Sequence, residues 1–350
     1  MMIVMKIKSL LLAIAMVAIC GVAKAHDFVC TINNQPVYFN VLSNKSVEVT
    51  YKGKVTDKTP TNYNGELVIP ETVNYNGATY RVVAIGPKAF RNAQKLTAIR
   101  LPESINSIGD FAFENCTALQ SIVFPANEVK FGQGAFFNCT SIKNVTFGSN
   151  WQVLNLEMFR WSSSLSELHI PANVVQVKNA KRLKGLRSFT VDKNNKRLAS
   201  YDGVLYSKDF KTLYICPRAF FGRLYVHGGT EVITNGALVN SVYVTEVVLP
   251  QSLTELSFRE FSRMKNLEAI YFNSYYPIIT ATSSYGSRVF LLQVANPNVI
   301  IYTPNDKKVL KRYRDAICLK AGEYRDNDGV PYSVYPSELP AKDKFVKRNK

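Results

Sequence analysis

A period of 23 residues runs through the middle of this sequence. The pair Ala89-Phe90 recurs at Ala112-Phe113 and Ala135-Phe136, and Met158-Phe159 follows at the same spacing. Two further slots keep this spacing: an aliphatic residue six places after each phenylalanine, and an apolar residue five places before it. They are filled by Leu96, Leu119, Ile142 and Leu165, and by Ile85, Ile108, Phe131 and Leu154. A fixed period of this length predicts stacked supersecondary units that bury one continuous core.

Another part of the repeat has the pattern apolar-x-apolar-Pro. It occurs at Ile99–Pro102, Ile122–Pro125 and Leu168–Pro171, and Val145–Gly148 fills the remaining place with glycine at its end. The alternation of apolar and variable residues predicts one half-buried strand in each unit. The period is lost over an insertion at about residues 192–222 and resumes after it.

Residues 108–125 carry all of these slots in one run, IGDFAFENCTALQSIVFP. This run resembles the consensus I-G-x-x-A-F-x-x-C-x-x-L-x-x-I-x-L-P of the BspA-like, or treponemal-type, leucine-rich repeat family, and the resemblance covers roughly residues 60–315. It implies a mainly β solenoid, a right-handed superhelix of about eight coils of 23 residues, with a hairpin inserted at Asp202–Asp209. It also implies a secreted or surface protein of Bacteroidetes-like bacteria, some of whose relatives are adhesins.

The N-terminal segment 1–25 has the features of a secretory signal peptide. Basic residues precede an apolar run over residues 10–19, and small residues end at Ala25. We expect cleavage after Ala25 and residence outside a bacterial cell or in its periplasm, with lipid attachment at Cys20 as the alternative. No other segment approaches the 18 consecutive apolar residues of a membrane span, so we expect no transmembrane segment.

The rest of the chain is expected to hold one array of repeats with covered ends. Residues 26–83 are rich in strand and turn signals and predict an N-terminal β-hairpin cap, because a solenoid must cover its first apolar face. The repeats occupy residues 84–275 and a C-terminal cap residues 276–318. Helical spacing within 306–317 predicts a capping helix, and residues 319–350 read as a basic tail.

The basic composition limits the partners that the protein attracts. Lys and Arg exceed Asp and Glu by 43 to 26, and the formal net charge is +17. Such a charge favours an acidic extracellular protein or an anionic glycan, although it also keeps a secreted protein soluble. We expect no specific nucleic-acid binding and a monomeric protein.

Cysteine usage indicates buried thiols rather than disulfides. Cys116 and Cys139 occupy one slot of the repeat, and the neighbouring units place Ala93 and Ser162 there. A slot shared by Ala, Cys and Ser requires a small side chain, so free buried thiols are expected, with a bridge between stacked units as the alternative.

Signals of catalysis are nearly absent. The chain has three histidines, and none of the common nucleophile, zinc-protease or nucleotide-binding motifs occurs. No pair of residues has the spacing of metal ligands. We therefore expect no enzyme, no cofactor and no metal.

Two groups of residues are candidates for binding. Outward positions of the predicted strands supply the first group, which comprises Arg100, His169, Tyr225 and Tyr271. A basic cluster over residues 178–197 supplies the second, which comprises Lys181, Arg182, Lys184 and Arg187, although such a cluster can also be a solvated loop. We expect non-catalytic, adhesion-type recognition of host or extracellular macromolecules, with glycan binding for nutrient capture as the alternative.

Overall fold

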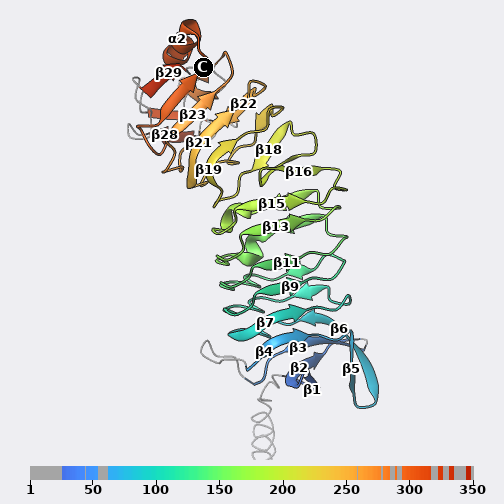
Figure 1. Cartoon of the computed structure of the whole chain (residues 1–350). Coiled ribbons are helices and arrows are strands. Elements are labelled where there is room, and N and C mark those ends of the chain that lie inside the picture. Colours follow the sequence, from blue (N-terminus) through green and yellow to red (C-terminus); the bar gives the residue numbers. More distant parts are fainter. Residues whose placement is uncertain are drawn as a thin grey trace, which may run out of the picture.

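The computed structural model describes residues 26–43, 45–53, 62–257, 259–276, 279–283, 288–289, 294–316, 322–325, 331–334 and 344–347. In these residues the chain forms an elongated stack of short coils, each crossing the stack with short strands (Figure 1). The predicted signal peptide and Cys20 lie outside the described residues. No helix in the described part of the chain is long and apolar enough to cross a membrane.

The repeat period becomes the register of parallel sheets. Along one side, β4 (Asn64–Val68), β7 (Lys95–Arg100), β9 (Ser121–Val123) and β11 (Asn144–Thr146) pair in parallel, and β13 (Glu167–Ile170) pairs with β15 (Ser188–Val191). Between β7, β9 and β11, each residue lies opposite the residue 23 places later, as predicted. Each new coil therefore adds a strand to the sheet of the coil before it.

A second set of strands lines the other side of the coils. β6 (Ala78–Ile85), β8 (Ser107–Ile108) and β10 (Lys130–Phe131) pair in parallel, and β12 (Val153–Asn155) pairs with β14 (Gln176–Lys178). Two short 3₁₀ helices, η1 (Leu156–Phe159) and η2 (Ala180–Arg182), lie at the turns of adjacent coils. They replace the irregular turns that the earlier coils have at the Ala-Phe slot.

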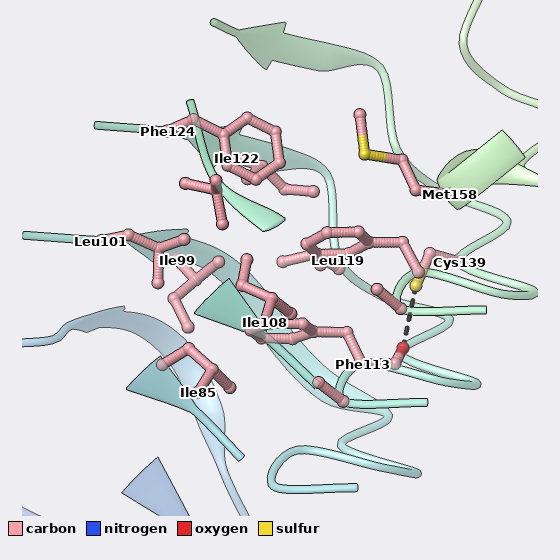
Figure 2. Close-up of a cluster of buried hydrophobic side chains, with 14 of the residues drawn as sticks. Ile85, Ile99, Leu101, Ile108, Phe113, Leu119, Ile122, Phe124, Cys139 and Met158 are labelled. Atoms are coloured by element: carbon pink, nitrogen blue, oxygen red, sulfur yellow. Dashed lines mark hydrogen bonds between the residues drawn. The ribbon is translucent and has the colours of Figure 1, made fainter. Parts of the chain in front are cut away.

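The predicted phenylalanine column is confirmed. Phe90 and Phe113 stack with ring centroids 5.0 Å apart, Phe113 and Phe136 are 4.8 Å apart, and Phe136 and Phe159 are 5.4 Å apart. All four rings are fully buried, and Figure 2 shows Phe113 within this core. Burial of each ring stabilises the stack by about 2 kcal/mol.

The cysteine slot also behaves as predicted. Cys116 and Cys139 are free and buried, and each thiol donates to a backbone carbonyl of an earlier coil. The Cys116 Sγ lies 3.1 Å from the Phe90 oxygen. The Cys139 Sγ lies 3.0 Å from the Phe113 oxygen, a contact drawn in Figure 2. These thiol contacts explain why a small side chain with a weak donor fits the slot.

The N-terminal end of the stack is covered by antiparallel strands. β1 (Phe28–Ile32), β2 (Gln35–Val41) and β3 (Ser46–Thr50) form a meander, and β3 then pairs in parallel with β6. β5 (Thr72–Tyr75) forms a hairpin with β6. Phe28, Phe39 and Val49 close the apolar end of the core.

The insertion replaces one coil and divides the core in two. β16 (Leu198–Tyr201), β17 (Val204–Ser207) and β18 (Thr212–Ile215) are antiparallel, and β18 joins the second array through β20 (Val232–Ile233). The carbonyl of Gly203 in the β16–β17 turn accepts the Phe189 N–H at 2.8 Å. This contact covers the exposed edge of β15, so β15 and β19 do not pair and the strand face of the stack is interrupted.

The second array repeats the same architecture. β19 (Phe221–Tyr225), β21 (Tyr243–Leu249), β23 (Ala269–Phe272) and β26 (Ile300–Thr303) form a parallel sheet, and β20, β22 (Glu255–Ser257) and β24 (Ile279–Ser283) pair on the other side. The predicted capping helix is α2 (Lys307–Ala316), whose first turn is capped by the Asp306 carboxylate.

The expected basic tail contains regular structure. β29 (Phe345–Lys347) pairs in parallel with β26, and β27 (Gly322–Arg325) pairs with β24 and β28 (Pro331–Val334). In the expected C-terminal cap, β25 (Arg288–Val289) also pairs with β24. Strands of two to four residues carry too few alternations to be recognised from periodicity, which is why this segment looked irregular.

Candidate binding surface

Five side chains gather on the outward face of the second parallel sheet. Tyr225, Val248, Tyr271 and Tyr302 lie opposite one another on β19, β21, β23 and β26. Arg223 Nη1 donates to the Tyr225 hydroxyl at 3.0 Å, and Arg223 Nη2 donates to the Tyr271 hydroxyl at 3.4 Å. The rings of Tyr271 and Tyr302 stack with centroids 4.5 Å apart. We call Arg223, Tyr225, Glu246, Tyr271 and Tyr302 the tyrosine platform.

Within the tyrosine platform, Arg223 forms an ion pair with Glu246. Arg223 Nε donates to Glu246 Oε2 at 2.7 Å from the opposite strand, and Arg223 Nη2 donates to the same oxygen. The hydrogen bonds to Tyr225 and Glu246 raise the pKa of Arg223, and desolvation, followed by Glu246, raises the pKa of Tyr271. The platform is therefore a flat aromatic surface with little net charge, which suits stacking against a sugar ring or a planar peptide group.

A groove adjoins the platform where the insertion interrupts the strand face. It has a volume of about 1010 Å³ and runs along the amino ends of the strands from β11 to β21. Its lining comprises Lys143, Ser163, Ser164, Ser166, Lys184, Gly185, Arg187, Ala219, Phe221 and Tyr243, and we call it the cationic groove. The two aromatic side chains are 79% and 48% exposed, an unusual use of large apolar residues at a surface.

The structure brings several predicted site residues to this region. Tyr225 and Tyr271 belong to the tyrosine platform, and Lys184 and Arg187 line the cationic groove. His169 lies in an adjoining hollow of about 400 Å³ that shares Lys143 with the groove, and its Nδ1 is 3.1 Å from Thr190 Oγ1.

Arg100 does not join them. It lies on β7, and its Nε donates to Glu66 on β4 at 2.9 Å. Three coils separate β7 from β13, which carries His169, so these two residues cannot contact one small ligand together.

Lys181, a binding candidate from the basic cluster, contacts other parts of the chain instead of extending into solvent. This side chain is partly buried, and its Nζ donates to the Cys216 carbonyl at 2.6 Å and to Ser241 Oγ at 3.3 Å. Burial lowers the pKa of Lys181 to about 8. The side chain thus tethers the coil before the insertion to residues within and after it, which sequence spacing could not indicate.

The other basic residues of the cluster point in different directions. Arg182 pairs with Glu157 at 3.3 Å, whereas Lys184 Nζ lies 3.9 Å from the centre of the Trp161 ring. The sequence analysis did not select Arg223, Phe221 or Tyr243. Arg223 lies opposite Glu246, whereas Phe221 lies opposite Tyr243 before a register shift between β19 and β21 that periodicity could not predict. The described residues contain no group of three or more side chains suited to hold a metal ion.

One solved structure supports the fold described above. The chain resembles the solved structure of a leucine-rich repeat protein from Bacteroides ovatus with 22% identity, covering 79% of this chain and 71% of that chain, at a TM-score of 0.50. It also resembles the pneumococcal vaccine antigen PcpA, with 16% identity, 83% and 97% covered, and a TM-score of 0.47. A leucine-rich cell surface protein from Faecalibacterium prausnitzii has 19% identity, 81% and 90% covered, and a TM-score of 0.40.

The sequence repeats identify the family of this chain. No curated protein matches the chain. The model of the BspA-type leucine-rich repeat region matches in six copies over residues 76–201 and 224–295, on both sides of the insertion. The chain therefore belongs to the BspA-type leucine-rich repeat family.

Proposed function

We propose that this chain is a non-catalytic binding protein, secreted or displayed at a cell surface, that recognises host or other extracellular macromolecules in an adhesion-type contact. The observation that carries this proposal is the exposed surface made by the cationic groove and the tyrosine platform. Membership in a leucine-rich repeat family supports a recognition role, because stacked coils offer extended binding faces. A right-handed superhelix of about eight coils would provide such a face.

The surface has the composition of a protein-recognition site. Phe221 and Tyr243 are exposed anchors of the kind that dominate interface energetics, and Lys184 and Arg187 add positive charge beside them. Removal of Lys6, Lys8 and Lys24 with residues 1–25 lowers the formal net charge from +17 to +14, which would still speed the approach of an acidic partner. We therefore propose an acidic extracellular protein as the main class of partner.

Export is part of the same proposal. The signal peptide would be removed after Ala25 and leave His26 as the mature N-terminus, whereas a lipoprotein would begin at Cys20. Mass spectrometry of the N-terminal peptide from the native host distinguishes these two products, and a chain that retains Met1 contradicts export by either route.

The binding role is tested on arrays of extracellular-matrix proteins and glycans. We expect the wild-type protein to bind at least one protein partner, and the double variant Phe221→Ser/Tyr243→Ser to lose at least tenfold in affinity. Tyr214→Ser is the matched control, because Tyr214 is 37% exposed but lies on β18 in the other sheet. Equal losses in both variants, or no binding to any array, would refute the proposal.

One observation favours glycan capture as a second candidate. The stacked rings of Tyr271 and Tyr302 are nearly parallel, at 5°, and present a flat surface on the sheet. Neutral sugars bind such surfaces through their apolar faces. Under this alternative, Tyr302→Ala abolishes binding to a neutral oligosaccharide and leaves protein partners bound.

A further inference from the structure

One position of the repeat changes its residue in a coil that precedes the insertion. Asn92, Asn115 and Asn138 recur every 23 residues with φ near +60°, and their side chains form a ladder of hydrogen bonds of 3.0 and 2.9 Å. Asparagine tolerates this left-handed backbone better than other side chains with a Cβ. The next place in the column is Trp161, which has a φ of 71°.

Within the chain, Trp161 contacts the ammonium group of Lys184, which lies 3.9 Å from the centre of its ring. The bulky side chain is disfavoured at positive φ, and 45% of Trp161 is exposed to solvent. An asparagine would relieve the backbone and could extend the ladder from Asn138. Backbone strain of this kind is enriched at binding sites, and Phe111 and Phe210 share it, so the surroundings of Trp161 decide whether a ligand binds here.

The surroundings of Trp161 are strongly basic. A pocket of about 420 Å³ is lined by Arg160, Trp161, Lys181, Arg182, Lys184, Arg218, Asn240 and Arg263, and we call it the Trp161 pocket. Asn240, with a φ of 67°, and Arg263 are again 23 residues apart, and they hold the corresponding place in the coils after the insertion. The pocket therefore forms where the insertion interrupts the asparagine column.

Several of these charges have no acidic neighbour to neutralise them. Arg160 and Arg182 share Glu157, at 3.7 and 3.3 Å. No carboxylate of the described residues pairs with Lys184, Arg218 or Arg263. Unpaired cations around one pocket create a positive potential that is relieved by an anion.

We propose that the Trp161 pocket binds an anionic saccharide, a sugar that carries sulfate or carboxylate groups. The apolar face of one sugar ring lies against the indole of Trp161, and its anionic groups contact Lys184, Arg218 and Arg263. The pocket volume of about 420 Å³ is sufficient for a short oligosaccharide and too small for a folded partner. This inference rests on the proposed extracellular binding role and deepens it by naming one ligand class and its subsite.

The key variant is Trp161→Asn, which restores the residue of the preceding coils and is expected to fold with an unchanged or higher melting temperature. A sulfated heparin tetrasaccharide is titrated into the whole protein, and tryptophan fluorescence is followed; the only other tryptophan, Trp151, is 2% exposed. We expect saturable quenching in the wild type, loss of at least tenfold in affinity by calorimetry for Trp161→Asn, and a similar loss for Arg218→Ser. Lys95→Ser, an exposed cation on β7, is the control and should bind like the wild type.

Two comparisons decide between a saccharide and charge alone. Salt should weaken tetrasaccharide binding, and Arg218→Ser should reduce that salt dependence, because fewer charges are engaged. Inorganic sulfate should bind at least tenfold more weakly than the tetrasaccharide; equal affinity would overturn the saccharide assignment. Unchanged affinity in Trp161→Asn, or no binding by the wild type, would overturn the site. The Phe221→Ser/Tyr243→Ser protein should still bind the tetrasaccharide, so failure of the proposed protein-recognition role is seen separately.

Discussion

Replacing Lys181 by methionine tests whether one partly buried ammonium group joins the two halves of the stack. Lys181 donates to the Cys216 carbonyl within the insertion and to Ser241 Oγ beyond it. Methionine keeps the length of the side chain and leaves both acceptors without this donor. The loss of two partly buried hydrogen bonds is expected to cost about 2 kcal/mol of unfolding free energy near pH 7.

The ammonium also makes stability depend on pH in a defined direction. Burial lowers the pKa of Lys181 from 10.5 to about 8, so the charged form is destabilised in the folded protein. Between pH 8 and 10.5 the unfolded chain binds this proton and the folded chain does not, so the free energy of unfolding rises with pH over this window. The shift corresponds to about 3 kcal/mol at most.

Glu260, whose charge acts on Lys181, makes the free energy of unfolding change with pH in the opposite direction at lower pH. Burial raises the pKa of Glu260 to about 7, although the backbone N–H groups of Leu238 and Gly236 and the charge of Lys181 oppose the rise. Between about pH 4.5 and 7 the folded protein holds this proton and the unfolded chain does not. Stability therefore falls as pH rises through that range, and in Lys181→Met the pKa of Glu260 should rise further because the cation is gone.

Urea denaturation of the wild type and of Lys181→Met, at intervals from pH 5 to 10.5, measures how the free energy of unfolding depends on pH. At each pH, the unfolding free energy of the variant is subtracted from that of the wild type. This subtraction removes the contributions of groups that titrate in the same way in both proteins. We expect the difference in unfolding free energy, wild type minus variant, to increase by 1–3 kcal/mol between about pH 8 and 10.5. A flat difference across this range would show that the ammonium is as well solvated when folded as when unfolded, and it would refute the reasoning.

Three further predictions follow from the packing. Phe113→Ala should lower the free energy of unfolding by about 3–5 kcal/mol, because it opens a cavity between two stacked rings, whereas Phe221→Ala, at an exposed ring, should change it by less than about 0.5 kcal/mol; equal urea midpoints would contradict the column. The thiols of Cys116 and Cys139 should not react with a thiol reagent until the protein unfolds, and rapid reaction of the native protein would contradict their burial. Gly203→Ala should lower the melting temperature, because the turn has a φ of +75° and a Cβ would lie 2.8 Å from the Ser188 Cβ; an unchanged melting temperature would show that the turn can move.

The sequence predicted the interior of the stack because every coil meets the same packing constraint. Phe113 contacts its equivalents one period away on both sides, so a residue that fits in one coil fits in the next. The same translation fixes the strand register and the shared environment of Cys116 and Cys139. Periodicity is a strong predictor wherever the neighbours of a residue are copies of itself.

The binding surfaces could not be predicted in this way. Trp161 precedes the insertion, Arg218 lies within it and Arg263 follows it, so no fixed spacing relates these three residues. Lys181 looked like an exposed member of a basic cluster, and only the path of the insertion supplies its acceptors. Conversely, the side chain of Arg100 points outward from its strand as predicted, but several coils of the stack separate Arg100 from the other candidate residues.

A uniform repeat presents the same surface in every coil, whereas a binding site requires a place that differs from its surroundings. In this protein the differences gather at the insertion: the strand face is interrupted there, the core divides, and the asparagine column changes to Trp161. The cationic groove and the Trp161 pocket both border that break and share Lys184. Because Lys184 contributes to both, a ligand in one should alter binding in the other, through competition for its charge rather than through a change in the stack.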